Sequence, residues 1–330
     1  MIKHECDRPI AGGFGPRMTD PPITSDKLPF RNASAAPRVA PDTLAQHVSQ
    51  LAGVIGERNV FQPNAYSDAA HYIEATWRGF GYDVSVQEYD AGGVRSANLE
   101  ATRIGTCPDQ ILLIGAHYDS VRGSPGANDN ASGIAAMLEL SRLFSAIQPT
   151  VSVRFVAFAN EEPPFFRGRH QGSVVYAKAA RARGDDIRLM ISLETVGYFS
   201  DAAGSQRYPP LFRYFYPDRA NFIGFVSNLR SRRLMQLVAT MFRTASDFPL
   251  QQVATLSIVP GVAWSDHRSF WQQGYPAFMV TDTAFYRYRY YHTDADTPNK
   301  LSYPQFAEMT KGLHLALLRL AQSNAEDWPR

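Results

Sequence analysis

Cysteine, long apolar runs and charge of one sign are all scarce in this chain. Its 330 residues include only Cys6 and Cys107, so it has neither a disulfide framework nor a CxxC zinc or redox motif. No apolar run approaches the about 18 residues that span a bilayer. The 33 Lys and Arg residues nearly balance 31 Asp and Glu residues. This balance predicts neither a nucleic acid nor a membrane surface as a partner.

The first 38 residues are rich in Pro, Gly and Asp and show little hydrophobic periodicity. They predict an extended arm over residues 1–38, followed by one domain over residues 39–330. The N-terminus lacks the apolar core of a signal peptide, which favours a cytoplasmic protein. A different start codon would leave export open. The sequence gives no indication of the oligomeric state.

Hydrophobic periodicity indicates an α/β fold. Two helices are predicted first, then a pair of alternating strands in YDVSVQEYD and SANLEATRIG. Continuous apolar runs separated by helical segments follow, which is typical of a largely parallel sheet covered on both faces. The first helix is predicted from the spacing of Leu44, Val48, Leu51 and Ile55, and the second from that of Ala70, Ile73 and Trp77. The apolar runs span residues 111–115, 151–159, 189–193, 222–226 and 277–280.

Side chains capable of metal binding or acid–base chemistry follow these runs. In open α/β sheets, ligands bind outside the carboxyl ends of the strands, which is where these residues are expected. They are His117 and Asp119 in LLIGAHYDS, Asp129 in GSPGANDNASG, Glu161 and Glu162 in VRFVAFANEEPPFF, Glu194 in LMISLETVGY and His292 in YYHTDADT.

Two imidazoles and several carboxylates at one sheet edge suit zinc better than calcium or magnesium, which favour all-oxygen shells. A two-metal site needs one bridging carboxylate and a histidine and a carboxylate for each ion. We therefore predict two Zn²⁺ per chain. Asp129 is the expected bridge, His117 and Glu194 are expected on one ion, and Glu162 and His292 on the other.

This assignment leaves Glu161 free to act as general acid and base for a zinc-activated water. Asp119, two residues after His117, is expected to orient that imidazole through its second nitrogen. Each residue alone also has an ordinary structural explanation, such as surface charge or turn chemistry. The metal hypothesis rests on all of them falling at the ends of core strands.

The motifs together resemble those of the zinc exopeptidases of peptidase family M28, the aminopeptidase and glutamate-carboxypeptidase type. They are AHYDS, GANDNASG, NEEPP, SLETVGY, SDHRSFWQQGYPA and YYHTDADT, in that order, over roughly residues 40–320. The resemblance implies a three-layer α/β/α sandwich with a mixed, mostly parallel sheet. It also implies peptide substrates, two zinc ions, the ligand and acid–base roles given above, and a cis peptide bond between Asp129 and Asn130.

Some positions differ from the family pattern or have no assigned role. Many members carry Asp in place of Glu194, and the segment PPFFRGRHQGSVVYA after Glu162 is richer in Pro, Phe and Arg than in simple aminopeptidases. Asp266 and His267 belong to the pattern, and we expect them to support the site without ligating metal. The aromatic run FYRYRYY, residues 285–291, has two open interpretations, a pocket border or ordinary packing.

The favoured function is removal of N-terminal residues from peptides by a metallo-exopeptidase. A single-zinc glutaminyl cyclase is the alternative, although such enzymes place Trp before the last histidine, where this chain has Tyr291. Carboxypeptidase action on acidic residues would need Arg287 or Arg289 pointing into the pocket. A non-catalytic binding domain is less favoured, because all six ligand and acid–base positions are filled.

Overall fold

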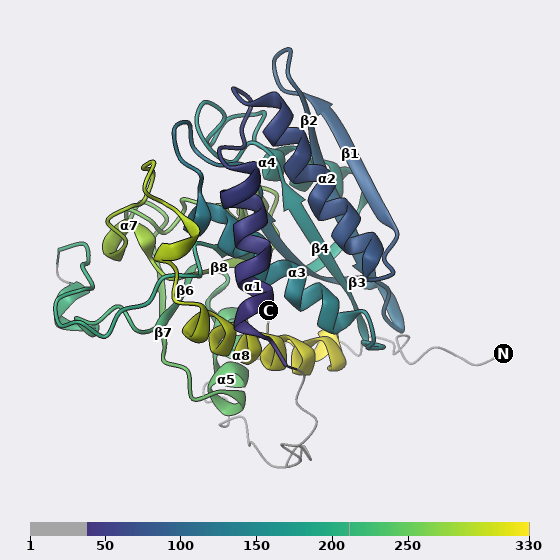
Figure 1. Ribbon diagram of the computed structural model, residues 1–330. Coiled ribbons are helices and arrows are strands. Elements are labelled where there is room, and N and C mark those ends of the chain that lie inside the picture. Colours follow the sequence, from purple (N-terminus) through teal and green to yellow (C-terminus); the bar gives the residue numbers. More distant parts are fainter. Residues whose placement is uncertain (1–37, 211, 330) are drawn as a thin grey trace. The chain divides into compact units, whose positions relative to one another are not determined.

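A mixed sheet of eight strands runs through the described residues, 38–210 and 212–329, of the computed structural model (Figure 1). The strand order is β1-β2-β4-β3-β5-β8-β6-β7. The four central strands, β4, β3, β5 and β8, are parallel to one another. The strands are β1 (Val84–Asp90), β2 (Arg95–Arg103), β3 (Cys107–His117), β4 (Val151–Phe158), β5 (Asp186–Glu194), β6 (Ile223–Asn228), β7 (Leu250–Thr255) and β8 (Ala277–Thr281).

Antiparallel pairs flank this central block on both sides. The strand β2 runs antiparallel to both β1 and β4, and β6 runs antiparallel to β8. The predicted pair of alternating strands is therefore confirmed as β1 and β2. The edge strand β7, parallel to β6, was not predicted. Its sequence, LQQVAT, has no apolar run, and after its buried first residue every side chain is partly exposed.

Helices cover both faces of the sheet (Figure 1). The helices α1, α2, α3, α5 and α8 pack on one face, and α4 and α6 pack on the other. The predicted three-layer α/β/α sandwich is thus confirmed. The helices are α1 (Pro41–Val48), α2 (Pro63–Gly79), α3 (Gly133–Phe144), α4 (Gly172–Arg183), α5 (Arg232–Ala245), α6 (His267–Gln272), α7 (Ala284–Arg287) and α8 (Tyr303–Gln322).

The central strands are apolar along their whole length because both of their faces are buried. In β3, Leu112 and Ile114 belong to the core under α3 and α8, whereas Ile111 and Leu113 belong to the core under α4 and α6. Side chains that alternate across a strand need two cores when helices cover both faces. Ile114 stands level with Phe155 of β4 and Ile191 of β5 in the ladder.

The first predicted helix differs from the expected regular α-helix. The α-helix ends at Val48, and the chain continues as π-helical turns over η1 (Ser49–Ile55) until Gly56, whose φ is 81°. Leu44, Val48 and Leu51 are nevertheless buried, as the periodicity predicted.

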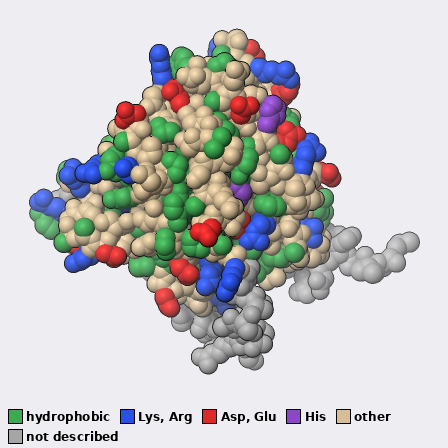
Figure 2. All heavy atoms as spheres, viewed as in Figure 1, with side chains coloured by type: hydrophobic (Ala, Val, Ile, Leu, Met, Phe, Trp, Pro, Cys, Tyr) green, Lys and Arg blue, Asp and Glu red, His purple; other side chains and the backbone are tan. Residues whose placement is uncertain are grey.

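The predicted arm over residues 1–38 lies outside the described residues, except for Arg38. Residues from Val39 onward form a compact unit of their own. No helix among the described residues is long and apolar enough to cross a membrane. On the face drawn in Figure 2, acidic and basic side chains are interspersed.

Candidate metal centre

The five predicted ligands come together at the carboxyl ends of the parallel strands. His117 and Glu194 are the last residues of β3 and β5, and Glu162 follows β4 by four residues. Asp129 lies in the turn η2 (Ala127–Ser132), and His292 lies in the loop after α7. All except His292 are buried. The sheet order therefore converges residues that are up to 175 positions apart in sequence.

Their side chains form two groups that share Asp129. In the first, His117 Nε2 lies 3.3 Å from Asp129 Oδ1 and 3.4 Å from Glu194 Oε2. In the second, His292 Nε2 lies 3.0 Å from Asp129 Oδ2 and 3.3 Å from Glu162 Oε1. The two oxygens of one carboxylate thus face two different histidines.

Three of these four separations fit zinc, and the contact between His292 and Asp129 is slightly shorter. Ligands at about 2.0–2.2 Å in a tetrahedral shell are about 3.3–3.6 Å apart. The chemistry of the donors also fits, since each group offers one imidazole nitrogen and two carboxylate oxygens. His117 Nε2, Asp129 Oδ1 and Glu162 Oε1 are buried without hydrogen-bond partners. Buried polar atoms rarely lack partners, so a cation between them would explain all three.

The charges of the site depend on one another. Burial opposes protonation of His292, but its contacts with Asp129 and Glu162 outweigh burial and raise its pKa to about 10. Burial acts to raise the pKa of Asp129, and its close contacts with His117 and His292 outweigh burial, so that the pKa falls. Metal ligands must be deprotonated, so a metal ion would displace protons from these imidazoles.

Asp119 holds three parts of the site at once. Its Oδ1 and Oδ2 accept hydrogen bonds from the backbone N–H groups of Glu161 and Glu162, at 3.0 and 3.1 Å. Its Oδ1 also lies 3.4 Å from His117 Nδ1. The predicted contact with His117 is present. The contacts with the two glutamates were not foreseen, and they position the residues after β4 as well.

Glu161 belongs to neither ligand group. Its side chain is buried, and Oε1 has no hydrogen-bond partner. Burial raises the pKa of this carboxyl well above its usual range, although the positive field of His117 opposes the shift. Asn160, immediately before it, has a φ of 57°, in the left-handed region. Such backbone strain concentrates at functional sites.

Asn128, Asp129 and Asn130 lie in a tightly bonded turn. The Asp129–Asn130 peptide bond is cis, as the family resemblance implied. The Asn130 amide donates to Leu193 O at 2.8 Å, and its oxygen accepts from Thr195 N at 3.0 Å. The turn is thereby fixed to the end of β5, next to Glu194.

Asp296 is a supporting residue that the sequence did not reveal. Its carboxylate accepts from the N–H groups of Asn128 and Asp129 at 2.8 and 3.1 Å, and from the Tyr288 hydroxyl at 2.7 Å. It lies four residues after His292 in the motif YYHTDADT. This short spacing was the one clue in the sequence to the role of Asp296, because a single loop carries both His292 and the carboxylate that holds the Asp129 backbone.

Arg58 is a second residue that the sequence did not single out. Its fully buried guanidinium donates to Tyr118 O at 2.7 Å, to Gly126 O at 2.8 Å, and to Gly56 O and Pro125 O. Burial lowers the pKa of Arg58 to about 10, against the fields of carboxylates that include Asp296 and Asp119. In the sequence, Arg58 stands alone between the two predicted helices and belongs to no recognisable motif.

Asp266 and His267 are buried and occupy supporting positions. Asp266 Oδ1 accepts a long hydrogen bond from Gln171 Nε2, and His267 Nε2 contacts Val262 O at 2.8 Å. Neither residue belongs to the two ligand groups. Ser265, just before them, donates to Glu194 Oε2 at 2.7 Å. This bond orients the side chain that differs from the family's usual Asp.

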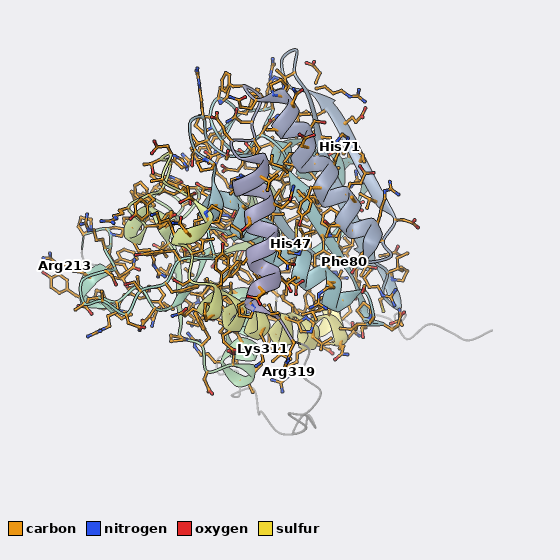
Figure 3. The ribbon with its side chains drawn as sticks, viewed as in Figure 1. His47, His71, Phe80, Arg213, Lys311 and Arg319 are labelled. Atoms are coloured by element: carbon orange, nitrogen blue, oxygen red, sulfur yellow. The ribbon has the colours of Figure 1, made fainter. Side chains whose placement is uncertain are left out.

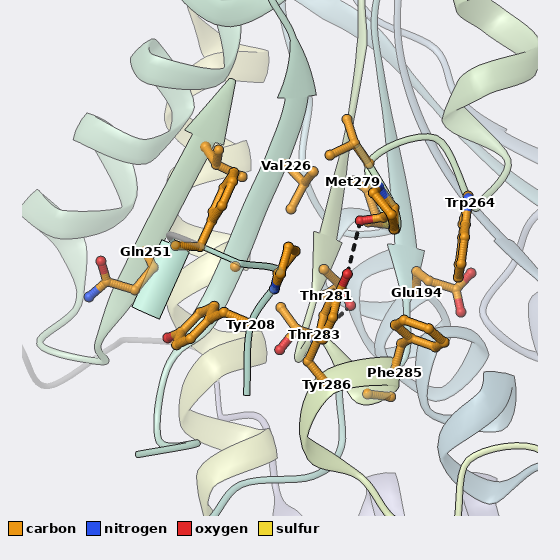
Figure 4. Close-up of a pocket in the computed structure, with 18 of the residues that line it drawn as sticks. Glu194, Tyr208, Val226, Gln251, Trp264, Met279, Thr281, Thr283, Phe285 and Tyr286 are labelled. Atoms are coloured by element: carbon orange, nitrogen blue, oxygen red, sulfur yellow. Dashed lines mark hydrogen bonds between the residues drawn. The ribbon is translucent and has the colours of Figure 1, made fainter. Parts of the chain in front are cut away.

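An apolar cavity opens beside Glu194 (Figure 4). Its walls include Trp264, Met279, Phe285 and Tyr291, and no Lys or Arg is among its lining residues. The Tyr291 ring stacks on His292, with centroids 3.9 Å apart. The cavity thus adjoins both ligand groups.

The aromatic run therefore divides between the two interpretations. Phe285, Tyr286 and Tyr291 line the cavity, whereas Tyr288 is buried against Asp296. Arg287 does not line it. Its guanidinium binds Gln206 Oε1 at 2.7 Å and Phe222 O at 2.9 Å. Arg289 is exposed and packs on Tyr290.

The histidines outside the motifs lie apart from the metal centre, and His4 falls outside the described residues. His47 on α1 contacts the Tyr72 hydroxyl at 2.6 Å, and His71 on α2 is exposed (Figure 3). His170 pairs with Arg169, and His314 packs edge-on against Phe144. All four are thus accounted for by packing, hydrogen bonding or exposure.

Comparisons with known proteins agree with this geometry. The model of peptidase family M28 matches residues 98–317. An uncharacterized Escherichia coli protein, YfbL, is 36% identical over 86% of this chain and 90% of its own length. A probable aminopeptidase of Saccharomyces cerevisiae is 26% identical over 74% of this chain, which spans only 64% of that relative.

Solved structures show the same fold. A zinc aminopeptidase from Bacillus subtilis has a TM-score of 0.69 and 16% identity, over 89% of this chain and 98% of its own. A glutaminyl cyclase from Bacteroides thetaiotaomicron has a TM-score of 0.65 and 17% identity, over 88% and 99%. At these identities the structures support the fold and do not distinguish the two activities.

Proposed function

Because the chain belongs to peptidase family M28, we propose that it is a two-zinc aminopeptidase that releases residues from the free amino ends of peptides. The observation that carries the proposal is the pair of ligand groups sharing Asp129, with one further carboxyl, Glu161, outside both. Each group has a histidine and a carboxylate of its own.

In this proposal, His117 and Glu194 would hold one ion, Glu162 and His292 would hold the other, and Asp129 would be shared by both. Bound zinc lowers the pKa of a coordinated water to about 7 and polarises a substrate carbonyl. Asp119 fixes the orientation of the His117 ring, and Ser265 fixes that of Glu194. These contacts hold the ligand atoms in place before any ion binds.

Glu161 is the proposed general base and acid. Its carboxylate takes a proton from the attacking water and passes it to the nitrogen of the leaving amine. Asp119 holds its backbone N–H, and burial excludes bulk water from its carboxyl. Burial raises the pKa of this carboxyl, which favours a group that both accepts and returns a proton.

The apolar cavity is the proposed site for the side chain of the first residue. Its volume is about 120 Å³, somewhat less than the about 150 Å³ of a cavity that holds a benzene molecule. We therefore expect a preference for apolar aliphatic side chains such as leucine. The absence of Lys and Arg from its lining, together with the bonds that hold Arg287, argues against a carboxypeptidase for acidic residues.

A single-zinc glutaminyl cyclase stays the alternative, since such an enzyme shares the fold. The complete second ligand group and Tyr291 before the last histidine favour the peptidase. A binding domain without activity has no evident need for a buried, unpartnered carboxyl such as Glu161.

The test is a peptide panel in zinc-loaded protein, with and without chelator. It contains an unblocked leucine peptide, its N-acetyl form and a peptide beginning with glutamine. Chelator-sensitive cleavage of the unblocked peptide alone supports the proposal. Ammonia release without chain shortening supports the cyclase. If no peptide in the panel gives a product, both proposals are contradicted. Metal analysis is expected to give two zinc ions per chain.

Glu161→Gln tests the proton-transfer role. General acid–base groups contribute about 10²–10⁴-fold to rate, so turnover should fall by that order while both zinc ions stay bound. Glu74→Gln, on the partly exposed surface of α2, is the matched control and should leave turnover unchanged. Loss of zinc from Glu161→Gln would contradict the role, because it would make Glu161 a ligand.

A further inference from the structure

A second groove adjoins the apolar cavity. Two arginines, Arg167 and Arg268, stand among its lining residues, together with Trp264 and Trp271. Trp264 and Pro260 line both the groove and the cavity. The two spaces are therefore neighbours that share a wall.

The side chains of Arg167 and Arg268 line the same groove. Consistent with this, partial burial and then the charge of Arg167 lower the pKa of Arg268. Over residues 38–210 and 212–329, neither arginine forms an ion pair with a carboxylate. Arg167 Nη2 instead donates to Ala263 O at 3.1 Å. Two adjacent cations without an anion are a favourable place for a carboxylate.

The groove is tied to the metal centre by a short segment of chain. Ala263 O holds Arg167, and Ser265, two residues on, donates to Glu194 Oε2. Two residues of chain span at most about 7 Å. Arg167 also follows Glu162 by five residues, in a loop whose first turn closes with Phe165 N donating to Glu162 O. This path places one wall of the groove on the chain that also holds Glu194.

We propose that Arg167 and Arg268 bind a carboxylate of the peptide substrate, one or two residues beyond the bond that is cut. This inference rests on the proposed aminopeptidase function and extends it to the leaving-group side. The carboxylate has two sources, the C-terminus of a dipeptide or tripeptide and the side chain of Asp or Glu in a longer peptide. The enzyme would then favour short or acidic peptides.

The test compares matched substrates. Leu-Ala is compared with Leu-Ala-amide for the chain terminus, and Leu-Glu-Ala-amide with Leu-Gln-Ala-amide for the acidic side chain. Leucine p-nitroanilide, which has no carboxylate, is the reference. We expect at least one carboxylate substrate to exceed its neutral partner by about tenfold in kcat/KM, through a lower KM. The pair that shows the difference identifies the source.

In Arg167→Gln and Arg268→Gln, this difference should shrink severalfold in each and disappear in the double variant. Cleavage of leucine p-nitroanilide should stay within about twofold of the wild type. Arg169→Gln is the control, because Arg169 lies in the same exposed loop, pairs with His170 and does not line the groove. It makes the same change in charge and should keep the difference.

The outcomes separate the two proposals. If the wild type cleaves each carboxylate substrate and its neutral partner with equal kcat/KM, and also cleaves the anilide, the groove inference is overturned and the aminopeptidase function is not. The groove inference is also overturned if the double variant loses kcat/KM equally for both members of a pair. No cleavage of the anilide or of any peptide overturns the aminopeptidase function itself.

Discussion

The buried arginine behind the metal centre offers the strongest test of how the site is held together. We consider Arg58→Met, which keeps a long apolar side chain and removes the guanidinium. Four backbone carbonyls, those of Gly56, Tyr118, Pro125 and Gly126, lose this donor, and Gly126 O keeps its bond from Ala131 N at 3.1 Å. A buried polar group left without a partner costs about 1–3 kcal/mol. Relaxation would recover part of this, because Gly56 lies near the partly exposed end of η1.

We therefore expect the free energy of unfolding to fall by about 3–5 kcal/mol, the range found when one partner of a buried charged network is removed. The variant also withdraws a positive charge from the neighbourhood of Asp296, Asp119 and Asp129, which by itself would favour a cation. Gly126 directly precedes the turn that carries Asp129, and we expect its loss of support to outweigh the change in charge, so zinc affinity should fall by about 10–100-fold.

Urea unfolding of the chelated protein and zinc competition with a chromogenic chelator measure the two effects separately. Arg58→Lys, which keeps the charge but not the planar fork of donors, should lie between the wild type and Arg58→Met. Arg95→Met, at an exposed pair with Glu88, is the control and should change neither quantity. A loss of less than about 1 kcal/mol in Arg58→Met would refute the reasoning, because the carbonyls would then have other partners.

Three further perturbations follow from named contacts. In Asp119→Asn, the amide oxygen can still accept one of the two backbone N–H bonds, but the amide NH₂ group would face the other backbone N–H. Activity or zinc affinity should therefore fall about 10–100-fold, while circular dichroism shows that the fold is retained. Tyr288→Phe removes one of three donors to Asp296 and should cost about 0.5–1.5 kcal/mol in urea unfolding, with zinc stoichiometry unchanged. Burial lowers the pKa of His314 to about 4, so the unfolded chain binds a proton between pH 6.5 and 4 that the folded protein does not. Stability should therefore fall as pH falls through that window, and His314→Leu should abolish part of the slope, on the order of 3 kcal/mol; an unchanged slope would show that the imidazole is solvated.

The convergence of the proposed ligands was predictable because zinc chemistry restricts both residue type and place. His117 and Glu194 end their strands, and Asp129 lies in a Gly- and Asn-rich turn that leads into a helix. A parallel sheet brings such positions to one edge whatever the loop lengths between them. His292 follows the same rule less closely, since the helix α7 intervenes between β8 and its loop.

The support around the ligands was less predictable. Asp296 and Arg58 act on backbone N–H and C=O groups, and a sequence does not reveal which loop will present unpaired backbone groups to which side chain. The edge strand β7 was missed for a related reason, because its pairing with β6 satisfies backbone groups without an apolar pattern.

These supporting contacts also explain how so many carboxylates can share a buried edge. Asp119 and Asp296 each accept backbone N–H hydrogen bonds with both carboxylate oxygens. The fixed N–H dipoles therefore stabilise the negative charge of these two carboxylates. Asp129, Glu162 and Glu161 keep at least one oxygen free of such bonds. The protein thus separates carboxylates that build the frame from carboxylates that stay available for metal and proton. Replacing a frame residue should mainly loosen the geometry, whereas replacing an available one should mainly remove a ligand or a proton carrier.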